Sequence, residues 1–180
     1  MSQKTMGCLT DQHLIHFGTI IQCFVRHEVL MQEIMAAVSG ADVTSIKLLT
    51  SGLSFTEKRE ALLNLLRHRA VPLNQFEHIR NYLQMPRTYT TLRNDIAHST
   101  WAEGAPQNSV SPIWLTHGPM KAVKPVHDIG KGTKEYIEDY EDKTTYTLDD
   151  LREIGENLAL NYVGFREYIA KVDLMATPAA

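Results

Sequence analysis

Cysteine is scarce in this chain of 180 residues, which contains only Cys8 and Cys23. Two cysteines at this spacing provide neither a disulfide framework nor the ligand pattern of a zinc site, so we expect free thiols in a reducing compartment. The sequence also lacks an N-terminal basic-then-apolar signal segment. Its longest apolar runs are far shorter than the roughly 18 residues that a membrane span requires. We therefore expect a cytoplasmic protein without a membrane partner.

Positive charge is not in excess either. The chain carries 18 Lys and Arg residues against 21 Asp and Glu residues, a net charge of −3, which argues against a dedicated high-affinity nucleic-acid-binding protein. The charges are unevenly divided, because residues 1–127 have 12 basic and 9 acidic side chains whereas residues 128–180 have 6 and 12. Three interpretations of the acidic part are open: it repels RNA, it mimics RNA, or it is a solvated surface. The last is the most typical of charge on a helix and its leading loop.

Several common catalytic patterns are missing. The sequence has no phosphate-binding loop, no paired carboxylates and no serine triad. Residues 130–133 resemble the end of a phosphate loop but lack its upstream glycine and its strand-turn-helix context. His13 and His16 have a spacing that can bind a metal, but no carboxylate or cysteine close by in sequence completes a ligand set. We therefore expect neither a metal ion nor a cofactor.

Apolar residues recur at three- and four-residue intervals over most of the chain, which is the period of an amphipathic helix. Asp11 is a candidate N-cap, Gly40 a candidate stop, and Ser54 forms a capping box with Glu57. Pro86 must break or kink the run that contains it, because proline lacks an N–H donor and clashes with the preceding turn. The predicted helices cover residues 11–38, 54–69, 72–85, 86–98 and 147–172, and residues 42–50 are expected to form either a short helix or a turn.

The segment 102–146 differs from this pattern because it is rich in glycine and proline. Within this irregular insertion, residues 113–115 and 135–140 are candidate strands of a small β-hairpin. Trp101 borders this insertion, and Trp114 lies in it. They either stack on RNA bases or pack the insertion onto the helices, and the second role is the more typical of a large aromatic side chain.

These elements define one domain. A chain of 180 residues can bury a sizeable core, and we expect residues 1–180 to form a single helical domain with frayed ends at 1–10 and 173–180. The fold class is all-α: an antiparallel bundle of four to five helices, with an irregular insertion before the last helix.

The most informative chemistry lies in residues 93–98, at the end of a predicted helix. Arg93 carries a permanent charge and a forked set of donors that matches phosphate. His98 is suited to transferring protons near neutral pH, and Asn94, four residues earlier, shares its helix face. The core-facing stripe of this helix consists of Tyr89, Leu92 and Ile96. Arg93 and Asn94 should therefore point toward solvent, a cleft or a partner.

Ordinary roles for these residues are also open. Arg93 is compatible with a surface arginine that pairs with Asp95 or Glu77. His98 is compatible with a helix-end histidine that the helix dipole favours. The case for a site comes from their combination with Asn94 and with the flanking residues.

The sequence RNDIAHSTW, residues 93–101, resembles the Arg-x4–6-His signature of the HEPN superfamily (higher eukaryotes and prokaryotes nucleotide-binding). In that family the arginine is usually followed by a polar residue, often asparagine, and the histidine closes the helix. Arg93, Asn94 and His98 fall on these positions, and Trp101 lies where a tryptophan often follows. Ser99 departs from the glycine of many relatives, which predicts a different exit from the helix.

The resemblance implies a metal-independent endoribonuclease that cleaves single-stranded RNA through attack of a ribose 2′-hydroxyl. Arg93 would hold the phosphate, His98 would act as general acid or base, and Asn94 would orient the histidine or the substrate. It also implies a symmetric homodimer that brings two motifs into one cleft. A toxin or defence effector with an antitoxin protein as partner is one role compatible with it. The family includes non-catalytic members as well, so a helical dimer that binds nucleotide, RNA or a partner protein stays open, as does a plain structural bundle.

Overall fold

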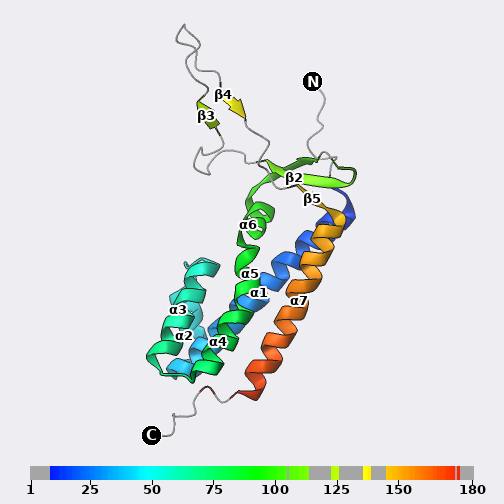
Figure 1. The fold of residues 1–180 in the computed structure, drawn as a ribbon. Coiled ribbons are helices and arrows are strands. Elements are labelled where there is room, and N and C mark those ends of the chain that lie inside the picture. Colours follow the sequence, from blue (N-terminus) through cyan, green and yellow to red (C-terminus); the bar gives the residue numbers. More distant parts are fainter. Residues whose placement is uncertain are drawn as a thin grey trace.

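The computed structural model describes residues 9–104, 106–113, 123–125, 136–138, 145–172 and 174. These residues form a helical bundle with two small antiparallel sheets at one end (Figure 1). The helices are α1 (Asp11–Ser39), α2 (Val43–Thr50), α3 (Phe55–His68), α4 (Leu73–Tyr82), α5 (Gln84–Thr88), α6 (Thr90–His98) and α7 (Leu148–Lys171). The predicted fold class is thus confirmed: a mainly helical bundle with a small sheet inserted before the last helix.

The start of α1 differs from the prediction by one residue. Thr10 is the N-cap instead of Asp11: its Oγ1 accepts a hydrogen bond from the N–H of His13 at 3.4 Å, and Nδ1 of His13 accepts one from the N–H of Thr10 at 3.1 Å. Asp11 lies in the first turn, where a negative charge interacts favourably with the helix dipole. Leu9 is partly buried against the core, so the ordered chain begins before the predicted boundary. The remainder of the predicted frayed N-terminus, residues 1–8, lies outside the described residues.

Two of the predicted helix signals, the stop at Gly40 and the capping box of Ser54 with Glu57, are confirmed. Gly40 ends α1 with φ 77°, a left-handed conformation that glycine adopts without a steric cost. The N-cap of α2 is Asp42, whose carboxylate accepts the N–H of Ser45 at 2.9 Å. At the start of α3, Ser54 accepts the N–H of Glu57, and Glu57 accepts the N–H of Ser54 at 2.7 Å.

The predicted single helix from Pro86 to residue 98 is instead two helices. Pro86 is the third residue of α5, in a first turn where a missing N–H is tolerated. The break falls at Tyr89, which has φ −100° and ψ 14°. The hydroxyl of Thr90 donates to the carbonyl of Arg87 at 2.8 Å, and such side-chain bonds compete with the regular backbone pattern of a helix. α6 therefore begins at Thr90 as a separate nine-residue helix.

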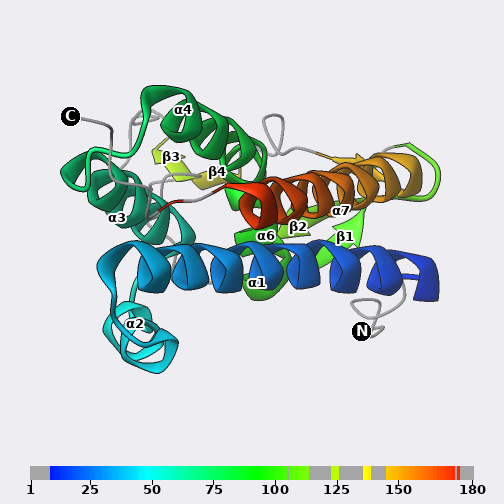
Figure 2. The ribbon, with the colours of Figure 1, turned by 90° about the horizontal axis from the view of Figure 1, so that it is seen from below.

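α1 and α7 lie side by side and run in the same direction (Figures 1 and 2). They approach closely at Gly155, where a Cβ atom would lie 3.3 Å from Cγ2 of Thr19. Farther along, Nε2 of the buried His27 lies 2.9 Å from Oδ1 of Asn161. The parallel direction arises because the insertion between α6 and α7 starts and ends near the beginning of α1. The run α4–α6 is antiparallel to both α1 and α7, as the predicted bundle requires.

One apolar cluster joins the helices. Its fully buried members come from α1, α3, α4, α6 and α7 and include Phe24, Met31, Leu62, Ile79, Leu92 and Phe165. α2 packs on the other side of α1 (Figure 2), where Nε2 of the buried Gln32 donates to Oγ1 of Thr50 at 2.9 Å. The core therefore lies between the α1–α7 pair and the layer formed by α3–α6.

The insertion contains more strands than the sequence predicts. These are β1 (Thr100–Glu103), β2 (Ser109–Ile113), β3 (Val123–Pro125), β4 (Tyr136–Glu138) and β5 (Tyr146–Thr147). The predicted strand 113–115 overlaps the end of β2, and the predicted strand 135–140 contains β4, but the residues of the two segments that the structure describes do not pair with each other. β2 pairs with β1 and β5, and β4 pairs with β3. A local turn explains the difference, because Asn108 has φ 57°, a conformation in which asparagine is tolerated, and it returns the chain directly onto β1.

Trp101 fastens this sheet to the bundle. Its side chain is buried, and its ring centroid lies 4.6 Å from that of Phe17 on α1. The packing interpretation is confirmed for Trp101, whereas Trp114 lies outside the described residues.

Candidate functional site

The motif residues are carried by α6 and by the chain that leaves it. Leu92 is buried, and Tyr89 and Ile96 are partly buried against the core, so the predicted apolar stripe is confirmed. The helix ends at His98. Ser99 follows in an extended conformation with φ −99° and ψ 153°, so the chain enters β1 without a left-handed residue, in agreement with the exit that a serine predicts.

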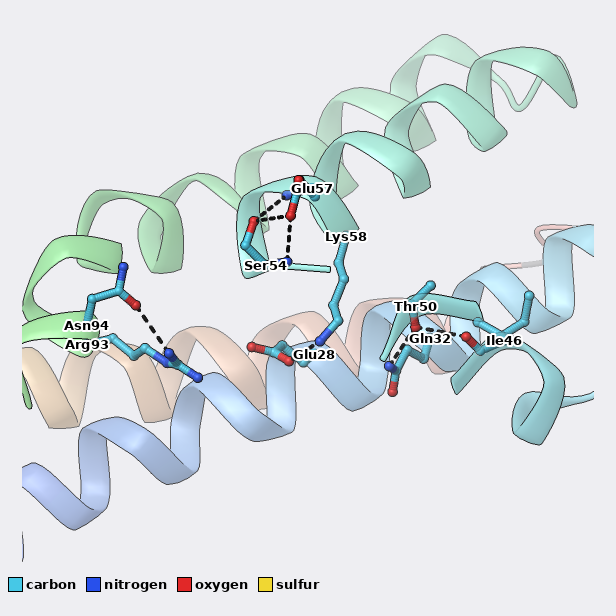
Figure 3. A network of polar contacts seen from close by, with 9 residues as sticks. All are labelled: Glu28, Gln32, Ile46, Thr50, Ser54, Glu57, Lys58, Arg93 and Asn94. Carbon is cyan, nitrogen blue, oxygen red and sulfur yellow. Dashed lines mark hydrogen bonds and ion pairs between the residues drawn. The ribbon is translucent and has the colours of Figure 1, made fainter. Parts of the chain in front are cut away.

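Arg93 is half-buried and extends from α6 toward α1 (Figure 3). Its Nη1 donates to Oδ1 of Asn94 at 3.2 Å. Its Nε is buried, and no described residue accepts a hydrogen bond from it. The side chain lies on the side of α1 where Glu28 pairs with Lys58 at 2.5 Å. The guanidinium thus retains donors that its own chain does not use.

Neither of the two carboxylates that the sequence suggests as ion-pair partners of Arg93 forms an ion pair with it in the described part of the chain. Asp95 lies on the opposite side of the helix, and Glu77 pairs with Arg80 at 2.7 Å. The ordinary surface-arginine interpretation therefore lacks the carboxylate that it predicts.

His98 is exposed at the last position of α6. No described residue forms a hydrogen bond with its ring, and no described contact joins it to Arg93. The structure therefore places the two residues on one short helix and brings Arg93 to Asn94, but it does not bring Arg93 to His98 within one chain. Their approach across two copies of the chain stays a prediction.

Asp95 is a residue of the motif that our sequence reasoning missed. Its side chain is only 4% exposed, and no described residue donates a hydrogen bond to its Oδ1. Burial raises the pKa of Asp95 from 3.8 to about 6, because a low-dielectric environment disfavours the charged carboxylate. A signal was present in the sequence: Asp95 is three residues after Leu92 and beside Ile96, so it falls within the apolar stripe.

Positive charge is concentrated on the helical layer that contains the motif. Residues 55–98, which form α3–α6, carry seven Lys and Arg residues against four Asp and Glu residues. α7 has three basic and five acidic side chains, and α1 has one and three. Charge in the described helices is therefore divided between two layers of the bundle, and α6 belongs to the more basic one. This is not the division along the sequence, because α1 is acidic although it lies within residues 1–127.

A cleft of about 600 Å³ lies away from these residues, between the starts of α1 and α7 and the turn before β2. Its walls include His16, Asn108 and Arg152, and it contains none of the motif residues. In the described part of the chain, no three His, Cys, Asp or Glu side chains are grouped as metal ligands would be. No helix among the described residues has the length and apolar character to cross a membrane.

Comparisons of the chain with protein families, with curated proteins and with solved structures found no match.

Proposed function

We propose that this protein is a HEPN-like endoribonuclease that cleaves single-stranded RNA without a metal ion. The observation that carries this proposal is the motif helix: it presents an exposed His98 and a partly unpaired Arg93 on the more basic layer of the bundle. Unused guanidinium donors fit the oxygens of a phosphodiester. The role of a toxin or defence effector, with an antitoxin protein as partner, belongs to this proposal.

In this mechanism the ribose 2′-oxygen attacks the adjacent phosphorus while the bond to the 5′-oxygen of the next nucleotide breaks. The products are a 2′,3′-cyclic phosphate and a 5′-hydroxyl. One proton leaves the 2′-hydroxyl and one is added to the departing 5′-oxygen, so two proton carriers are needed. His98 supplies one of them, Arg93 stabilises the charge that develops on the phosphate, and Asn94 orients the guanidinium through the bond to its Oδ1.

The second proton carrier is His98 of a second copy, which requires a homodimer. A feature of α1 supports such a dimer: between Gln12 and Val25 the helix has no Asp, Glu, Lys or Arg, yet Leu14 and Ile15 are exposed. Exposed apolar faces of this kind are typical of protein interfaces. Phe17, in the same part of α1, packs on Trp101, so this face lies at the level of the end of α6. A two-fold axis beside it would bring two copies of the motif together.

The test is cleavage of single-stranded RNA in excess EDTA, with detection of 2′,3′-cyclic phosphate ends. His98→Ala should lower the rate by about 10²-fold or more, and Arg93→Ala by roughly 10²–10³-fold. His68→Ala is the matched control, because His68 is also an exposed histidine in the last turn of a helix. DNA, which lacks the 2′-hydroxyl, should not be cleaved. Undiminished cleavage by the folded double variant would assign the activity to another site or to a contaminant.

A non-catalytic dimer that binds RNA, nucleotide or a partner protein is the second candidate. The orientation of Arg93 favours it, since its guanidinium contacts Asn94 and extends toward α1 without a described contact to His98. Light scattering together with RNA-binding measurements separates the two candidates. A dimer that binds RNA without cleaving it would support the binding function, and a strict monomer would remove the composite active site.

A further inference from the structure

The cleft of about 600 Å³ carries hydrogen-bonding groups that the chain itself does not use. It lies between the first turns of α1 and α7 and the turn that joins β1 to β2. Three of the side chains that line it are amides: Gln12 from α1, and Gln107 and Asn108 from the turn. All three residues are exposed, and no described residue forms a hydrogen bond with these amides. Each amide offers both donors and acceptors, so the cleft has unused groups of both kinds.

The walls of the cleft are held in place by the fold. In the turn, the N–H of Gly104 donates to the carbonyl of Ser109 at 2.9 Å, and Asn108 has φ 57°. At the start of α7, Thr147 and Asp150 form a capping box. The cleft is therefore formed before any ligand binds, as sites for small molecules usually are.

Two flat side chains face the cleft from different helices. These are the ring of His16 on α1 and the guanidinium of Arg152 on α7. Nη2 of Arg152 pairs with Oδ1 of Asp149 at 2.9 Å, and the arginine side chain is still 57% exposed. Unpaired bases stack on histidine rings and on guanidinium planes, so the cleft offers stacking surfaces in addition to its amides.

The charge of the cleft argues against an anion as its ligand. Among the residues that line it, Arg152 is the only Lys or Arg and Asp149 is the only Asp or Glu, and the two are paired. A ligand that matches this lining is uncharged and flat, with donors and acceptors along its edge. A nucleobase has these properties. Glutamine and asparagine amides form paired hydrogen bonds with base edges, and unpaired bases are recognised through both their edges and their faces.

Strand β1 connects the motif helix to this cleft. α6 ends at His98, β1 follows as Thr100–Glu103, and the chain then enters the turn of Gln107 and Asn108. Figure 1 shows α6 and the starts of α1 and α7 at the same end of the bundle as the sheet. An extended chain rises about 3.3 Å per residue, so the path from His98 to Gly104 covers at most roughly 20 Å. Several nucleotides of a single strand span such a distance.

We propose that this cleft binds an unpaired base of single-stranded RNA, several nucleotides away from the phosphate held at α6. The inference rests on the proposed function and deepens it, because it gives the protein a base preference. The amides of Gln12, Gln107 and Asn108 bind the edge of the base. The side chains of His16 and Arg152 stack on its face.

The first experiment tests the cleft without RNA. Isotope-labelled protein is titrated with adenosine, guanosine, cytidine or uridine, and the NMR signals of the side-chain amides are recorded. At least one nucleoside should shift the signals of Gln107 and Asn108, whereas ribose 5-phosphate, which has no base, should not. Gln84 is the internal control, because it is an exposed glutamine on α5 outside the cleft. The proposal is overturned if no nucleoside shifts these signals, or if ribose 5-phosphate shifts them as much.

The second experiment measures base preference in RNA. Fluorescence anisotropy is used with single-stranded oligomers in which one of the four bases predominates, in the His98→Ala background so that cleavage does not interfere. One base should be preferred about tenfold or more, as expected for a paired amide contact. Gln107→Ala should reduce the preference to about threefold or less. The salt slope should not change, because no phosphate contact is lost. Gln84→Ala is the matched control and should retain the preference.

Asn108→Gly is a second variant, because glycine adopts φ 57° readily and retains the turn. A base preference that persists in both Gln107→Ala and Asn108→Gly overturns the proposal. If nucleosides bind the cleft but no RNA oligomer binds the protein, the base site stands and the proposed RNA function fails. If RNA is cleaved and cleavage depends on His98, but no nucleoside reaches the cleft, the proposed function stands and the base site fails.

Discussion

Replacement of Asp95 by asparagine should make the protein more stable at neutral pH. The carboxyl group of Asp95 is 4% exposed, and burial raises its pKa from 3.8 to about 6. A group whose pKa is higher in the folded state binds its proton more tightly there, so its contribution to stability is fully present below pH 3.8 and is lost as the pH rises through about 6. At pH 7 this difference in pKa corresponds to a loss of about 3 kcal/mol.

Asparagine has nearly the same shape as aspartate and carries no charge. Its amide still needs hydrogen-bond partners in a place where Oδ1 of Asp95 has none among the described residues, and this requirement offsets part of the gain. We therefore expect Asp95→Asn to raise the free energy of unfolding at pH 7 by about 1–3 kcal/mol. For a chain of this length that is roughly 2–12 °C in melting temperature.

Urea unfolding at a series of pH values between 4 and 8 measures this effect. The difference between Asp95→Asn and the wild type should be small near pH 4, grow as the pH rises to about 6 and change little above pH 7. Asp149→Asn is the control, because Asp149 is an exposed aspartate in the first turn of α7 whose replacement should lower stability by about 1 kcal/mol or less, the opposite direction from Asp95→Asn. If Asp95→Asn is less stable than the wild type at pH 7 and the pH dependence is unchanged, the burial argument is wrong.

Two further predictions concern α1 and its contact with α7. Gly18→Ala should stabilise the protein by about 0.5–1 kcal/mol, because a Cβ atom at Gly18 meets nothing within 4 Å and alanine favours a helix. Gly155→Val should instead destabilise it by about 1–3 kcal/mol, because the larger side chain overpacks the contact with Thr19. Chemical unfolding of both variants measures this contrast. Burial lowers the pKa of His27. The contribution of neutral His27 to stability is therefore fully present above the pKa of an ordinary histidine and is lost as the pH falls toward the lowered pKa. His27→Gln should show a smaller decline in unfolding free energy between pH 7 and pH 5 than the wild type.

Local signals in the sequence predict most of the helices. The capping box at Ser54 and the glycine stop at residue 40 depend on neighbours within four residues, and both are confirmed. The cap of α1 was missed because the usual box has Glu or Gln three residues after the N-cap, and here the ring of His13 takes that place. The break at Tyr89 was missed because proline is the stronger signal in isolation, although a first turn accommodates it.

Features that depend on distant residues could not be predicted in this way. The common direction of α1 and α7 follows from where the insertion begins and ends. For the motif, the apolar stripe predicted that Arg93 and Asn94 point away from the core, and both are only partly buried. The distance between His98 and Arg93 depends instead on side-chain orientation and on a second copy. Periodicity does not determine either.

Three of the polar groups that lack a described partner lie within seven residues of one another: Nε of Arg93, Oδ1 of Asp95 and Oγ of Ser99. Each buried polar group without a partner costs roughly 1–3 kcal/mol, which is a large total for a helix of nine residues and the residue that follows it. Groups of this kind concentrate at functional sites, where substrate or a partner supplies what the free protein lacks. The same Asp95→Asn variant tests this argument. If it is more stable than the wild type and also cleaves or binds RNA less well, the cost at Asp95 serves the function of α6. If the variant is more stable and equally active, the buried carboxylate of Asp95 lowers stability without contributing to the proposed site.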